Sequence, residues 1–130
     1  MKRLQLFLRI FAIAPMSAAF AAVLPMGVMD RIHQAIGLGP IPQGPIVEYL
    51  ARSTSMFYAL HGVLLWYIAS DLIRYRDLFR FYLRVSLLFA AGLFFTDLSA
   101  GLPLRWTLVE GPMVGAFIGA IMVWFRKLSP

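Results

Sequence analysis

The chain of 130 residues is 61% hydrophobic and 14% charged, whereas a soluble domain carries about 25% charged residues. This composition leaves too few polar side chains to coat a water-soluble core, and it predicts one small integral membrane domain. The chain has no cysteine, which excludes disulfides, iron–sulfur ligation, thiolate nucleophiles and thiolate zinc sites. Its net charge of +6 comes from basic residues beside the apolar segments, so nucleic acid is not an expected partner.

Four apolar segments predict an all-α fold, a four-helix transmembrane bundle that occupies the whole chain, 1–130. Ile10–Met29 is uncharged over twenty residues, and Ser53–Ser70 has no acidic or basic side chain other than His61 over eighteen. At about 1.5 Å per helical residue, such runs approach the ~30 Å hydrocarbon core of a bilayer. The helices are expected at roughly 8–29, 46–70, 80–98 and 107–125.

The first apolar segment has a basic start and many small residues, as a secretory signal would. Arg9 interrupts the apolar core that a signal needs, so we expect a retained first helix. Pro15 is expected to kink this helix, and its alanines are expected to permit close packing against another helix.

A short interfacial helix is expected in the first outer loop. Asp30 is predicted to cap it and Gly37 to stop it. Met29, Ile32 and Ile36 share one face at helical spacing, which indicates a helix lying flat on the membrane surface. The nine residues that begin at Gly37 contain three glycines and three prolines, and they predict an ordered, irregular hairpin.

The distribution of basic residues predicts the topology. Nine lie on one side of the expected bundle: Lys2, Arg3, Arg9, Arg74, Arg76, Arg80, Arg84, Arg126 and Lys127. Three lie on the other: Arg31, Arg52 and Arg105. Cytoplasmic flanks collect Lys and Arg, so both termini are expected in the cytoplasm. Arg76, Arg80 and Arg84 recur every four residues; they are expected to anchor on lipid head groups or, alternatively, to dock an acidic partner.

His61 lies deep in the second predicted helix, where a polar side chain is a functional candidate. Gly62 and Ala59 are expected to leave room beside its ring for a tetrapyrrole. The alternatives are a neutral imidazole hydrogen-bonded to a neighbouring helix, or a role in handling protons or a ligand. His33 is in the outer loop, so one chain alone would not supply two axial ligands to a haem.

Charged residues near the outer helix ends form a second candidate site, comprising Asp30, Glu48, Asp97 and Glu110 with Arg31, Arg52 and Arg105. Glu48 and Arg52 are four residues apart in the favoured order, so they are expected to pair. The set predicts either salt bridges and caps that hold the loops together, or a mouth that binds a cationic or hydroxylated amphiphile.

The fourth helix is expected to start in a capping box, Thr107 to Glu110, with Pro112 in its first turn. Gly111, Gly115 and Gly119 then follow at intervals of four and predict a smooth packing groove. Either the alanine-rich first helix or a helix of another chain is expected to fill it.

Three segments, Met29–His33, Ile46–Ser53 and Tyr58–Gly62, resemble a group of small, uncharacterised four-helix bacterial membrane proteins. The resemblance implies an inner-membrane fold and no particular activity. With no motif for catalysis or for a metal, we expect a non-enzymatic accessory or scaffolding subunit of a larger membrane complex, such as a photosynthetic or respiratory one. The alternative is a small-molecule or lipid binder, or a transporter, that uses His61 and the outer charged residues.

Overall fold

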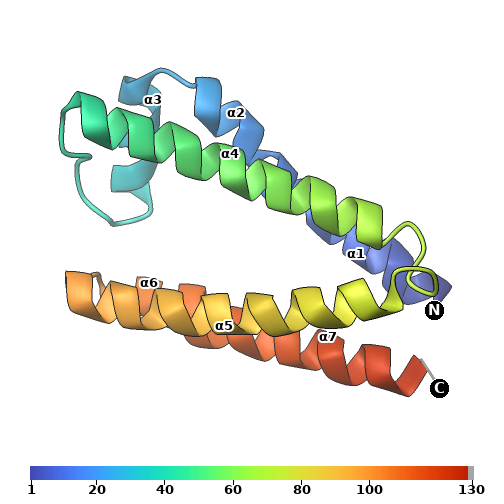
Figure 1. The fold of residues 1–130 in the computed structure, drawn as a ribbon. Helices are drawn as coiled ribbons and strands as arrows, with labels where there is room; N and C mark the ends of the chain where they lie inside the picture. The colour runs from blue at the N-terminus through green and yellow to red at the C-terminus, as the bar shows by residue number, and fades with distance from the viewer. Residues whose placement is uncertain (129–130) are drawn as a thin grey trace. The chain divides into compact units, whose positions relative to one another are not determined.

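The computed structural model describes residues 1–128, which contain helices and no strand (Figure 1). The elements are α1 (Lys2–Met16), α2 (Ala18–Val23), α3 (Met26–Ala35), α4 (Pro45–Ile68), α5 (Arg76–Ala100), α6 (Leu104–Leu108), the π-helical turn η1 (Val109–Met113) and α7 (Val114–Leu128). The chain divides into two compact units. We call Gln5–Ser70 the α4 unit, and Met1–Leu4 together with the chain from Asp71 onward the α5–α7 unit.

Three helical segments of the described chain are long and apolar enough to cross a membrane: Lys2–Val23, Arg76–Ala100 and Leu104–Leu128. Four such segments were expected from the sequence. The remaining helix, α4, has 24 residues, contains Glu48, Arg52 and His61, and is not among these three.

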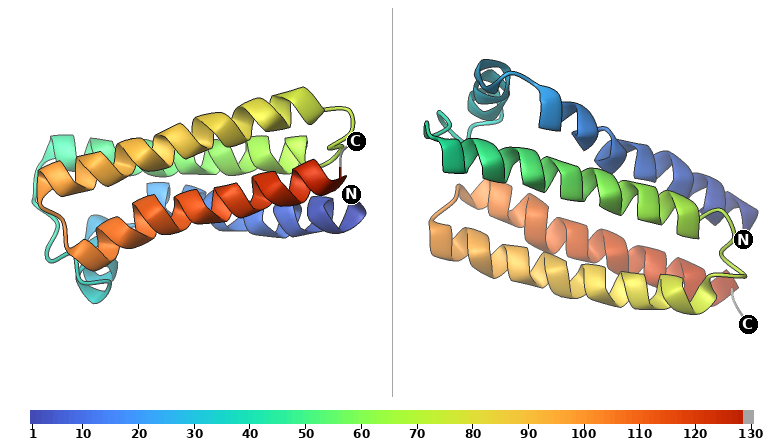
Figure 2. Two further views of the ribbon diagram at one scale, coloured as in Figure 1. Left: turned by 90° about the horizontal axis from the view of Figure 1, so that it is seen from below. Right: turned by 45° about the horizontal axis from the view of Figure 1, so that its top comes forward.

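In the α4 unit, α1 and α2 run beside α4 in the opposite direction (Figures 1 and 2). The helical segment that contains Pro15 is interrupted at Ser17, between α1 and α2. Gly62 of α4 lies at the contact with α1. A Cβ placed on Gly62 would be 2.6 Å from the backbone nitrogen of Met16 and 2.9 Å from the carbonyl oxygen of Ala12. The missing side chain is therefore what lets the two backbones approach so closely.

The first helical segment spans Lys2–Val23 rather than the expected 8–29. Its end follows from Pro25, since a residue before proline disfavours the helical conformation. Leu24 is accordingly extended, with ψ of 144°, and α3 begins directly after Pro25. Asp30 therefore lies inside α3, and its expected role as the cap of that helix is wrong. The expected stop is confirmed, because α3 ends before Gly37, which has a positive φ of 82°.

In the α5–α7 unit, α5 and α7 lie side by side and antiparallel (Figure 2). The buried rings of Phe79 and Phe125 meet edge to face, with their centroids 4.9 Å apart, and join the start of α5 to the end of α7. At its other end α5 closes on Gly101, which adopts the left-handed conformation. The N–H groups of Gly101 and Leu102 then bond the carbonyls of Leu98 and Asp97.

The last helical segment starts earlier than expected. Pro103 precedes its first turn, so Thr107 lies inside α6 and the predicted capping box is wrong. Pro112 lies within the π-helical turn η1 rather than in a first turn. A proline inside an α-helix removes a hydrogen bond and clashes with the carbonyl four residues earlier. The wider π-helical turn accommodates the ring while the segment continues into α7.

Candidate functional site

His61 is exposed on α4. Phe57 and Leu64, on the same face at helical spacing, are 71% and 43% exposed. Gly62 lies on a different face, which contacts α1. The space expected beside Gly62 for a tetrapyrrole is therefore filled by Met16, and the exposed side of the imidazole is the one that a partner can reach.

The outer charged residues of the α4 unit bind one another and the backbone. Arg52 donates to Glu48, with 2.8 Å between Nη2 and Oε1, which confirms the expected pair. The same guanidinium donates from Nη1 to the carbonyl oxygen of Ala22, at 2.6 Å. Ala22 lies in the last turn of α2, whose final carbonyls have no partner within the helix. Arg52 therefore joins the end of α2 to α4.

Asp30 stabilises the loop that follows α3 through hydrogen bonds. Its Oδ1 accepts the backbone N–H of Ile41 at 2.7 Å, and its Oδ2 accepts the side-chain amide of Gln34 at 2.8 Å. Nδ1 of His33 lies 2.6 Å from the carbonyl oxygen of Gly39. These contacts fold the loop back onto α3, so Asp30 and His33 have structural roles here.

Asp97, Arg105 and Glu110 belong to the α5–α7 unit. The Asp97 side chain is buried, with 4% of the residue exposed, and Oδ2 has no hydrogen-bond partner among residues 1–128. Glu110 accepts a hydrogen bond from Nε1 of Trp106 at 2.8 Å. Arg105 is exposed on α6. Asp97 therefore differs from the other acids of the predicted cluster in having a buried oxygen that no described group satisfies.

The three glycines at intervals of four have different surroundings. A Cβ on Gly111 would lie 2.6 Å from Cβ of Phe94, so α5 occupies this part of the groove. A Cβ on Gly115 would lie 3.7 Å from Leu87, an ordinary contact. One on Gly119 would meet no atom of another described element within 4 Å. The expected alanine-rich first helix is not what lies against Gly111.

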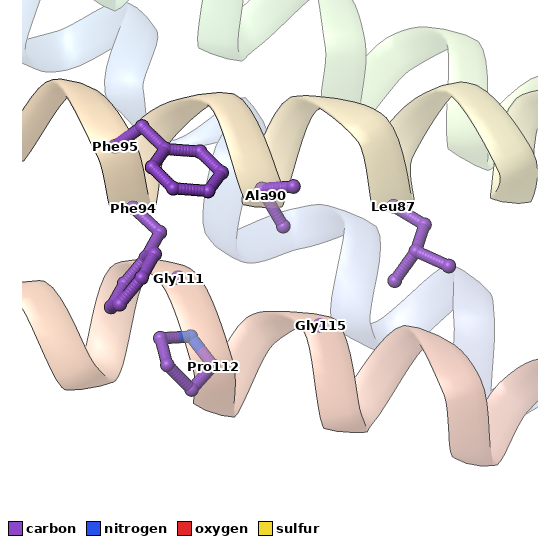
Figure 3. Close-up of a pocket in the computed structure, with 8 residues that line it drawn as sticks. Leu87, Ala90, Phe94, Phe95, Gly111, Pro112 and Gly115 are labelled. Atoms are coloured by element: carbon purple, nitrogen blue, oxygen red, sulfur yellow. The ribbon is translucent and has the colours of Figure 1, made fainter.

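An apolar cavity of about 230 Å³ opens beside Gly111 (Figure 3). Its lining comes from α5, η1 and α7: Leu87, Ala90, Ala91, Phe94, Phe95, Gly111, Pro112 and Gly115. His61, Asp97 and Glu110 do not line it. The cavity thus offers van der Waals contact and no charged group to a ligand.

Arg9 has a contact that sequence reasoning missed. Its guanidinium carbon lies 5.0 Å from the centre of the Trp66 ring, within cation–π range, so it joins α1 to α4. Its buried Nε has no hydrogen-bond partner in the described part of the chain. Sequence periodicity places each residue on a helix face, but no sequence signal pairs two side chains 57 positions apart.

The first turns of α5 contain Arg76, Arg80 and Arg84, of which Arg76 and Arg84 are exposed. Arg80 lies 3.3 Å from the exposed carboxylate of Asp77. Within residues 1–128 there is no group of three or more histidine and acidic side chains that could hold a metal ion.

Comparison with known proteins finds no family model that matches the chain and no significant match among curated proteins or solved structures.

Proposed function

We propose that this protein is a non-enzymatic subunit of a larger assembly in a bacterial inner membrane, and that the exposed face of α4 packs against another membrane protein. Three helices have the length and composition to cross a membrane, and α4, with 24 residues, is proposed as a fourth crossing. The division of basic residues, nine against three, supports cytoplasmic termini.

The observation that carries the proposal is the position of His61. Its imidazole is exposed on a face that it shares with the apolar side chains of Phe57 and Leu64. A polar side chain within a membrane helix is a functional candidate, and such side chains mark contacts with other helices or with cofactors. A photosynthetic or respiratory assembly is the proposed host, since its subunits also hold tetrapyrroles that an imidazole can contact.

Site-specific photocrosslinking in native membranes tests this proposal. The photoreactive residue p-benzoylphenylalanine is introduced by codon suppression at position 61, and at position 88 of α5, where Leu88 is 74% exposed, as the control. We expect position 61 to yield an adduct with a different polypeptide more strongly than position 88. Adducts only with lipid, or only with the same chain, would refute the proposal.

A second measurement uses the unaltered protein. A mild-detergent pull-down from native membranes, followed by an absorbance spectrum of the product, reports protein partners and coloured cofactors together. A monomer without partners under these conditions would contradict a role as a subunit.

A further inference from the structure

The basic residues of the α5–α7 unit gather at one end of its two long helices. The contact between Phe79 and Phe125 places the first turns of α5 beside the last turn of α7 (Figure 1). Arg105 lies on α6, near the opposite ends of these helices. The other basic residues of this unit are Lys2, Arg3, Arg74, Arg76, Arg80, Arg84, Arg126 and Lys127. This end is therefore strongly positive.

The acids of the same region are engaged locally. Oδ1 of Asp71 accepts the backbone N–H groups of Ile73 and Arg74, at 3.2 and 3.0 Å, and stabilises the turn before α5. Asp77 pairs with Arg80 across 3.3 Å at the surface. Neither contact involves α7, where Arg126 and Lys127 are both exposed.

A surface hollow of about 320 Å³ is lined by Val123, Arg126 and Lys127. Val123 is 52% exposed and lies one helical turn closer to the middle of α7 than Lys127. Trp124, beside it, is 37% exposed, and tryptophan is typical of the level of lipid head groups. The hollow therefore has an apolar side toward the middle of the helix and two cations toward its end.

We infer that this hollow binds an anionic phospholipid, with the head-group phosphate on Arg126 and Lys127 and the upper part of an acyl chain along Val123. The ligand must carry a negative charge next to a hydrocarbon chain, because the hollow presents both chemistries. A water-soluble acidic protein or a nucleic acid would match the two cations and leave Val123 exposed. Basic residues beside membrane helices attract anionic lipids in this way. The inference is independent of the partner proposed for α4.

Quenching of Trp124 by brominated lipids tests the site in the full chain. A Trp66→Phe/Trp106→Phe background leaves Trp124 as the one tryptophan, since the chain has three. In mixed micelles, we expect brominated phosphatidylglycerol to bind at least tenfold more tightly than brominated phosphatidylcholine. Removing both cations in Arg126→Gln/Lys127→Gln should weaken the binding of phosphatidylglycerol about 25-fold, because each basic residue near the surface contributes a factor of about five to the affinity.

The matched control is Arg31→Gln/Arg105→Gln, which lowers the net charge equally at residues outside this end. It should keep the wild-type preference, and an equal loss in both variants would overturn the site. Equal quenching by the two lipids would overturn it as well. Displacement of the lipid by inorganic phosphate or an oligonucleotide would assign the cations to that ligand and refute a lipid site. Native mass spectrometry of retained phosphatidylglycerol, with all three tryptophans intact, repeats the comparison should the background variant fail to fold.

Discussion

Replacing Gly62 by alanine is expected to destabilise the protein, against the usual preference of helices for alanine. The new Cβ would lie 2.6 Å from the Met16 nitrogen and 2.9 Å from the Ala12 carbonyl oxygen. Both are backbone atoms, so neither can move aside by a change of rotamer. Either α1 must withdraw from α4 or the two helices must remain strained.

Two opposing effects set the size of the change. Alanine is favoured over glycine within a helix by about 1 kcal/mol. Overpacking a close contact costs about 1–3 kcal/mol, with the upper part of the range expected where backbone must shift. The net expectation for Gly62→Ala is a loss of about 1–2 kcal/mol of unfolding free energy.

Gly119→Ala is the matched control, since Gly119 lies within a long apolar helix and has no described neighbour within 4 Å. Here only the helix preference acts, so we expect a gain of up to about 1 kcal/mol. Unfolding by sodium dodecyl sulfate in mixed micelles, followed by circular dichroism, measures both variants. If Gly62→Ala is as stable as Gly119→Ala, the close contact between α1 and α4 is wrong.

Three further substitutions test single contacts by the same unfolding measurement or by proteolysis. Asp97→Asn should raise the unfolding free energy by about 1 kcal/mol. The asparagine keeps the shape of a buried side chain whose Oδ2 has no described partner, and it removes the carboxylate charge. A loss of stability would instead reveal an ionic partner of Asp97. Asp30→Ala should speed cleavage near Ile41, because that backbone N–H loses its acceptor; unchanged cleavage would show that the loop is held otherwise. Arg52→Met should lower the unfolding free energy by about 1–3 kcal/mol, because the hydrogen bonds of the guanidinium to Glu48 and to Ala22 are lost. An unchanged unfolding free energy would contradict the role of Arg52 in joining α2 to α4.

Local sequence rules predicted correctly those features that depend only on residues within about one turn of a helix. The pair of Glu48 and Arg52 requires only a spacing of four, and the stop at Gly37 requires only a residue that tolerates positive φ. The same rules failed where proline and a capping residue competed for a helix start. Asp30 and Thr107 both suit a cap, but Pro25 and Pro103 lie earlier and already start the helix. A proline acts on its neighbours' backbone wherever it stands, whereas a capping side chain acts only at a free helix end.

The candidate site was harder to predict than the helices, because periodicity gives the face of a residue and not its partner. Gly111 and Gly119 each lie four residues from Gly115, yet one lies against Phe94 and the other has no described neighbour within 4 Å. The difference comes from Phe94, a bulky residue on another helix, and from the π-helical turn that begins just before Gly111. A repeated glycine motif therefore indicates that another helix can approach closely. The length and side-chain bulk of that other helix determine at which glycine of the motif the contact occurs. For this chain, that leaves Gly119 as the position where an alanine is tolerated and Gly111 as one where it is not.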